Sequence, residues 1–201
     1  MNEVRNMNKQ DVITFFDHYA SAWDADMIRN ESVINTILDN GGVHSGCTVL
    51  DVACGTGVLF PDYLQRNTKS VTAVDISPEM ARIAAGKYPD SPIEVICGDI
   101  ETISLDQKFD CCMVYNAFPH FPDPEHLVAT LASHLNPGGT LSVAHGMSRA
   151  RINEHHSGSA NKVSIGLLNE RELARIFAEV LEVTTVISNE EMYQVCGRKR
   201  G

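Results

Sequence analysis

The stretch Val49–Phe60, "VLDVACGTGVLF", joins a short apolar run to a turn that contains two spaced glycines, Gly55 and Gly57. An apolar run, a glycine-rich turn and a following helical pattern are typical of a strand–turn–helix unit in an α/β protein. In such proteins, ligands bind beyond the carboxyl ends of the strands, where a helix N-terminus offers N–H groups. We therefore expect a ligand to lie against Gly55 and Gly57, so that Gly57→Val would abolish binding without unfolding the chain.

The rest of the chain alternates between strand-like and helical patterns. Strands are predicted at residues 47–53, 70–76, 93–99, 109–116, 140–146, 180–187 and 191–198. Helices are predicted at residues 11–24, 27–40, 58–66, 78–87, 124–135 and 169–178. Because helices connect successive strands, the pattern predicts an α/β fold with a Rossmann-like, doubly wound, seven-stranded and mostly parallel sheet. The last two strands are close in sequence, so we expect a C-terminal hairpin that makes one edge antiparallel.

Length and composition indicate one globular domain over residues 1–201. The segment 146–168 has no strong period and is longer than most connections, which favours a lid-like insertion after the fifth strand. The "NPGG" at residues 136–139 predicts a turn into that strand. The sequence leaves the oligomeric state open.

The charge and hydropathy of the chain limit the kinds of partner that it can bind. Lys and Arg total 16 against 26 Asp and Glu, a formal net charge of -10, which argues against binding to nucleic acid. No apolar run is long enough for membrane insertion, and the polar start "MNEVRNMNKQ" does not resemble a signal peptide. The six cysteines form no C-x-x-C pair and are interpreted as reduced thiols. We therefore expect a soluble cytoplasmic protein.

The order of motifs resembles that of the class I S-adenosylmethionine-dependent methyltransferases, in particular the small-molecule and quinone-methylating branch. "VLDVACGTG" is similar to the first motif of that family, with Ala53 in place of its first glycine. "VTAVDIS" resembles the second motif, in which Asp75 would hold the ribose, and "CGDIE" resembles the third, in which Asp99 would accept from the adenine amino group. "NPGGTL" matches the turn before the fifth strand, and "FDHYASAWD" resembles the N-terminal helix that covers the cofactor.

The resemblance implies S-adenosyl-L-methionine as the cofactor, covered by helices within residues 1–40. The residues expected to bind it are Tyr19, Trp23, Asp51, Ala53, Gly55, Gly57, Asp75, Ile76, Met80, Asp99, Ile100, Tyr115 and Asn116. Spacing supports the ribose role independently, because Asp75 follows Gly57 by 18 residues, close to the roughly 20 residues that separate a glycine turn from its ribose-binding acid. Met80 is equally well interpreted as a core residue.

Methyl transfer from a sulfonium is an in-line displacement, so the enzyme aligns the reactants and removes a proton where needed. We expect a small-molecule acceptor with an O, S, N or metalloid atom near the ends of the fourth and fifth strands. Histidines gather on these segments, and the candidates for proton transfer are His120, His145 and His155. The same positions suit a divalent metal, with His120, His145, His155 and His156 as its candidate ligands. Arg149 and Arg151 are candidates to hold an anionic substrate group, or are surface charges.

Two other classes of protein remain open. A nicotinamide-dependent oxidoreductase would need a small residue where this chain has Phe60, which disfavours the dinucleotide fingerprint. A non-catalytic, cofactor-binding regulatory protein would share the same glycine turn and acidic strand ends. Turnover with candidate acceptors separates this second class from an enzyme.

Overall fold

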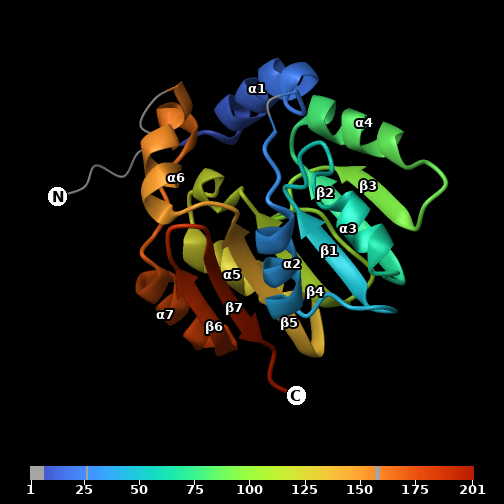
Figure 1. Ribbon diagram of the computed structural model, residues 1–201, viewed down its shortest axis with the longest axis vertical. Coiled ribbons are helices and arrows are strands. Elements are labelled where there is room, and N and C mark those ends of the chain that lie inside the picture. Colours follow the sequence, from blue (N-terminus) through green and yellow to red (C-terminus); the bar gives the residue numbers. More distant parts are fainter. Residues whose placement is uncertain (1–6, 26, 157–158) are drawn as a thin grey trace.

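The computed structural model describes residues 7–25, 27–156 and 159–201, and its centre is a seven-stranded sheet (Figure 1). The strands lie in the order β3-β2-β1-β4-β5-β7-β6. Their bounds are Thr48–Val52 (β1), Ser70–Asp75 (β2), Ile93–Cys97 (β3), Phe109–Tyr115 (β4), Leu135–His145 (β5), Glu182–Ser188 (β6) and Tyr193–Arg198 (β7). Strands β1 to β5 pair in parallel, whereas β7 is antiparallel to both β5 and β6. The predicted doubly wound sheet with an antiparallel C-terminal hairpin is confirmed.

Helices cover both faces of this sheet (Figure 1). Their bounds are Lys9–Tyr19 (α1), Glu31–Asn40 (α2), Phe60–Gln65 (α3), Pro78–Lys87 (α4), Pro124–Ser133 (α5), Arg149–His156 (α6) and Glu170–Val180 (α7). Short 3-10 helices occur at Ala20–Ala22 (η1), Phe118–His120 (η2) and Ser159–Val163 (η3). Neighbouring residues of β1 point to opposite faces, so Val49 packs with α2 and α3 while Leu50 packs with α5 and α7. None of the helices in the described ranges is long and apolar enough to cross a membrane.

Several element boundaries differ from the sequence prediction, each for a local reason. The second helix begins at Glu31 because the Asn30 side chain caps it by accepting from Val33 N. The strand predicted to begin at residue 140 begins at Leu135, so the "NPGG" lies inside β5 as an irregularity in its pairing with β4. Gly138 has a positive φ of 79°, as expected for a residue that bends the chain there.

The turn between β1 and α3 is built from left-handed backbone, with positive φ at Ala53, Gly55 and Gly57. A Cβ atom on Gly57 would lie 2.5 Å from the ring of Phe60, which is fully buried in α3. A Cβ atom on Gly55 would meet no atom within 4 Å. A larger side chain at Gly57 therefore conflicts with the core at Phe60, so the expectation that Gly57→Val would leave the fold intact is wrong. The expected ligand contact at Gly55 and Gly57 stays a prediction.

A buried carboxyl lies next to this turn. Asp51 on β1 is only 2% exposed and lies near the hydroxyl of Tyr63 on α3, which is also buried. Burial raises the pKa of Asp51 to about 8, an effect that the nearby Tyr63 hydroxyl partly offsets and that the charge of Asp75 reinforces. Asp51 is therefore largely protonated at neutral pH.

We expect Gly57→Ala to lower the free energy of unfolding by about 2–4 kcal/mol, because it adds a clash with Phe60 to the cost of left-handed backbone. Gly55→Ala is the matched control, with a similar φ but open space, and should cost about 1–2 kcal/mol. Urea denaturation of the cofactor-free chain measures both. Equal losses would show that Phe60 moves aside and that backbone strain is the whole effect.

The buried Asp51 predicts a pH-dependent stability. An unfolded Asp ionises near pH 4, whereas the folded pKa is about 8, so the folded chain holds the extra proton between these values. The free energy of unfolding should therefore fall as pH rises, by up to about 1.4 kcal/mol per pH unit, and this loss should be absent in Asp51→Asn. Denaturation of both proteins from about pH 5 to pH 8 measures the difference; parallel curves would contradict the assignment.

Candidate functional site

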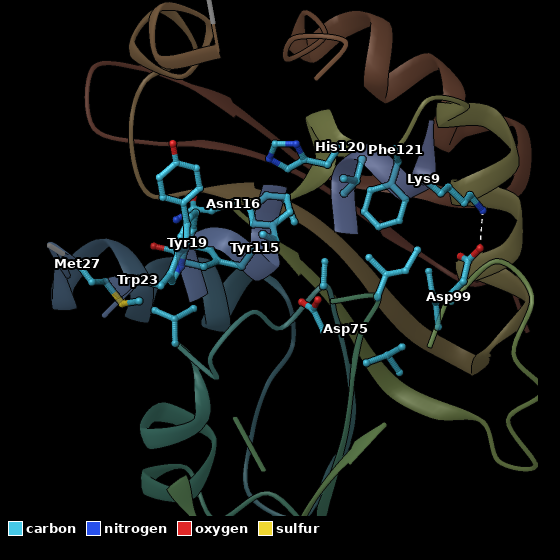
Figure 2. A pocket seen from close by; sticks show the side chains of 18 of the residues that line it. Lys9, Tyr19, Trp23, Met27, Asp75, Asp99, Tyr115, Asn116, His120 and Phe121 are labelled. Atoms are coloured by element: carbon cyan, nitrogen blue, oxygen red, sulfur yellow. Dashed lines mark hydrogen bonds and ion pairs between the residues drawn. The ribbon is translucent and has the colours of Figure 1, made fainter. Parts of the chain in front are cut away.

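A cavity of about 530 Å³ lies at the carboxyl ends of the parallel strands, under the N-terminal segment (Figure 2). The predicted cofactor residues that line it are Tyr19, Trp23, Ala53, Asp75, Ile76, Asp99, Ile100, Tyr115 and Asn116. Those outside its lining are Asp51, Gly55, Gly57 and Met80. Met80 is 1% exposed, in agreement with the core alternative. The binding roles of all these residues stay predictions.

The sheet order arranges the lining residues in a row. Asp99 follows β3, Asp75 ends β2, Ala53 follows β1, Asn116 follows β4 and Met147 follows β5. Because these strands are neighbours in that order, the cavity extends from the β3–β2 end to the β4–β5 end. The two ends can therefore receive two different parts of a ligand, or two ligands side by side.

The carboxylate of Asp75 lines the cavity and can accept further hydrogen bonds from a ligand. Its Oδ2 atom accepts from Gly55 N at 2.7 Å, and its Oδ1 atom accepts from Ser77 N at 2.9 Å. Burial raises the pKa of Asp75, although these two hydrogen bonds oppose the shift. Each carboxylate oxygen can accept more than one hydrogen bond, so both remain able to accept from a pair of ligand hydroxyls.

Asp99 is engaged by a lysine from α1, as Figure 2 shows. Lys9 Nζ lies 2.5 Å from Asp99 Oδ2 and 2.7 Å from Glu101 Oε2. Burial alone would lower the pKa of Lys9, but these hydrogen bonds and the two negative charges outweigh it and raise the pKa. A ligand amino group that binds Asp99 must therefore share the carboxylate with Lys9.

Two aspartates hold the N-terminal segment over the other strand ends. Asp17 Oδ1 accepts from Ser77 Oγ at 2.5 Å, after β2. Asp24 Oδ1 accepts from Thr56 Oγ1 at 2.5 Å, after β1, and Asp24 Oδ2 lies 2.6 Å from Lys87 Nζ. Sequence reasoning missed these contacts. Helical periodicity could not have found them together, because α1 ends at Tyr19 and Asp24 lies beyond the 3-10 helix that follows it.

His120 has a defined tautomer. Its Nδ1 atom lies 2.6 Å from the carbonyl oxygen of Val163 in η3. Because a carbonyl oxygen only accepts, Nδ1 carries the hydrogen, and in the neutral ring the lone pair lies on Nε2. Ile165 N donates to Pro119 O at 2.9 Å, and the Phe16 ring packs edge-on against the imidazole at 4.9 Å. His120 is thus held between α1 and the segment that follows β5.

The other candidate histidines are placed differently. His155 on α6 lines the same cavity as His120. His145 on β5 is fully buried with its ring 6.1 Å from that of Tyr193, and it does not belong to the cavity lining. The side chain of His156 lies outside the described residues. Among the residues that are described, no group of three or more His, Cys, Asp or Glu side chains is arranged to hold a metal ion.

Comparisons with known proteins identify relatives. A family model described as "Methyltransferase domain" matches residues 50–143. The chain is 26% identical over 195 residues to a malonyl-[acyl-carrier protein] O-methyltransferase of Priestia megaterium, covering 94% of this chain and 68% of the relative. It is 28% identical over 145 residues to a ubiquinone biosynthesis O-methyltransferase of Coxiella burnetii, covering 68% of this chain and 62% of the relative. The matches thus span about two thirds of these relatives.

The fold has solved counterparts. The N-methyltransferase NodS of Bradyrhizobium japonicum, in complex with S-adenosyl-L-homocysteine, superposes with a TM-score of 0.73 at 16% identity, covering 96% of this chain and all of that chain. At this identity the likeness concerns the fold alone. The glycine turn, the acidic ends of β2 and β3, the matching family model and the relatives together support a class I S-adenosylmethionine-dependent methyltransferase.

Proposed function

We propose that this chain transfers a methyl group from S-adenosylmethionine to an oxygen or sulfur atom of a small-molecule acceptor, with His120 as the base. The observation that carries the proposal is one cavity that contains Asp75 and Asp99 at one end and Asn116 and His120 at the other. Both relatives named above are O-methyltransferases, which supports an oxygen acceptor. When bound, S-adenosylmethionine supplies an electrophilic methyl carbon on a sulfonium.

The residues at the β3–β2 end fit the nucleoside part of that cofactor. The buried carboxylate of Asp75 suits a ribose diol, because its oxygens retain acceptor capacity on the cavity side. The apolar side chains of Ile76 and Ile100 line the same region and would pack against the adenine. Asp99 would accept from the adenine amino group while it keeps Lys9. These contacts would place the sulfonium towards β1 and β4.

His120 would then take the acceptor proton. Bound S-adenosylmethionine would supply the methyl carbon to the acceptor oxygen, and the electron pair of the broken carbon–sulfur bond would stay on the sulfur. The proton of the acceptor passes to Nε2 of His120, since Nδ1 already carries a hydrogen that it donates to Val163. The imidazolium that forms is stabilised by the same carbonyl, which is a better partner for a charged donor than for a neutral one.

We expect Asp75→Asn to weaken S-adenosylmethionine binding by about 1–3 kcal/mol, because the amide leaves one ligand hydroxyl without its acceptor. Titration calorimetry measures the affinity, and circular dichroism checks that the variant is folded. The exposed Asp106→Asn is the matched control and should bind normally. A folded Asp75→Asn variant with unchanged affinity would remove Asp75 from the cofactor site.

We expect His120→Asn to lower kcat by about 10²- to 10⁴-fold with cofactor affinity unchanged. The Asn side chain can still donate to the Val163 carbonyl but has no basic nitrogen, so the variant separates proton transfer from positioning.

The control for that experiment is the exposed His126→Asn, which should keep full activity. Assays with and without a chelator separate a base from a metal ligand, because a histidine base alone gives chelator-insensitive turnover. Full activity in His120→Asn would rule out the proposed proton transfer.

A further inference from the structure

The β4–β5 end of the cavity, where the acceptor would bind, is apolar and aromatic. Tyr115 and Phe121 come from β4 and the turn after it, and Met147 follows β5. From the N-terminal side, the Phe16 ring packs between His120 and Trp23, with centroid separations of 4.9 and 5.5 Å. Apart from Asn116 and His155, the lining residues named at this end give His120 apolar neighbours.

The lysine and arginine side chains that line the described part of the cavity are already paired with carboxylates. Lys9 contacts Asp99 and Glu101 at the opposite end. Arg29 makes two hydrogen bonds to the buried Asp62, at 3.0 and 2.9 Å, and two to Glu31, at 2.9 and 3.2 Å. A substrate carboxylate or phosphate would have to compete with these acids for its cation.

The two arginines that follow β5 do not supply a substitute. Arg149 Nε donates to the carbonyl oxygens of Leu167 and Leu168, and neither Arg149 nor Arg151 belongs to the cavity lining. The anion-binding role considered for them from sequence is therefore not supported by their placement. Transfer of a charged group into an apolar site without a paired cation is strongly unfavourable.

The rim of the cavity is apolar as well as its interior. Tyr19 is 40% exposed, Trp23 is 39% exposed and Ile28 is 95% exposed, and all three line the cavity. The other large hydrophobic side chains exposed in the described part of the chain are Val180 and Val186, near β6. Exposed apolar side chains that gather at a cavity mouth mark a binding site for apolar ligands.

We propose that the acceptor is an uncharged molecule with an apolar body, whose hydroxyl or thiol reaches His120 and whose body rests on Tyr19, Trp23 and Ile28. The proposal rests on the methyltransferase function above and adds the class of substrate. An anionic acceptor is disfavoured because it would leave its charge without a cation. The body can extend past Ile28, so the site tolerates substituents of different length at that end.

Binding tests this directly, because Trp23 is the only tryptophan of the chain and lines the cavity. The probes are 4-methylcatechol and 4-butylcatechol against 3,4-dihydroxyphenylacetate, titrated into the full chain saturated with S-adenosylhomocysteine while Trp23 fluorescence is recorded. We expect the neutral catechols to bind at least about tenfold more tightly than the carboxylate. The longer alkyl chain should strengthen binding further.

Two substitutions, each with its own control variant, test which part of the cavity binds the acceptor. Met147→Lys introduces a cation at the acceptor end and should shift the preference towards the carboxylate by about tenfold or more, whereas Met147→Leu should leave the ratio unchanged. Ile28→Ser should weaken 4-butylcatechol more than 4-methylcatechol. The matched control is Val186→Ser, an exposed apolar residue outside the cavity lining, which should change neither.

The outcomes separate the two proposals. Calorimetry without measurable S-adenosylmethionine binding would contradict the methyltransferase function itself. If the cofactor binds but the carboxylate probe binds as tightly as the neutral ones, or no catechol binds, the proposed substrate class is wrong and the function stands. A Met147→Lys variant that weakens all probes equally would also overturn the apolar acceptor site.

Discussion

The attachment of the N-terminal segment to the strand ends is the constraint on which the whole site depends. Without this attachment, the carboxyl edge of the sheet would be open to solvent. Asp17 and Asp24 fasten the segment after β2 and β1, and Lys9 fastens it after β3. These directed polar contacts act together with the burial of Val12 and Ala20 to fix the position of the cover. The cavity exists because these contacts set the height of α1 above the sheet.

The sequence predicted the fold well because the fold follows from local patterns. Alternation, glycine turns and strand-end acids predict that Asp75 and Asp99 lie at a common edge of the sheet. The failures concern contacts that no local pattern encodes. Lys9 and Asp99 are 90 residues apart, and their pairing depends on how α1 packs. The expectation for Gly57 fails for the same reason. Core packing places the Phe60 ring where it would meet a Cβ atom at Gly57.

The candidate histidines show the same limit of sequence-based prediction, here for the placement of single side chains. Four of them were grouped because β4 and β5 end side by side. His120 and His155 line the cavity, whereas His145 is buried on β5 beside Tyr193 of β7. His120 comes from the 3-10 helix after β4 and His155 from α6, so neither placement follows from the alternation of a strand. The carbonyl of Val163, which fixes the His120 tautomer, comes from a segment whose sequence has no clear period.

The three attachments of the N-terminal segment differ in how they respond to the solvent. The Lys9 end is an ion pair with a 44% exposed lysine, whereas Asp17 bonds to a hydroxyl that is fully buried. Dissolved ions screen the exposed pair far more than the buried bond. The attachment after β1 is mixed, because Asp24 bonds both to the buried Thr56 and to the partly exposed Lys87. Added salt should therefore weaken the contact after β3 most and the contact at Ser77 least.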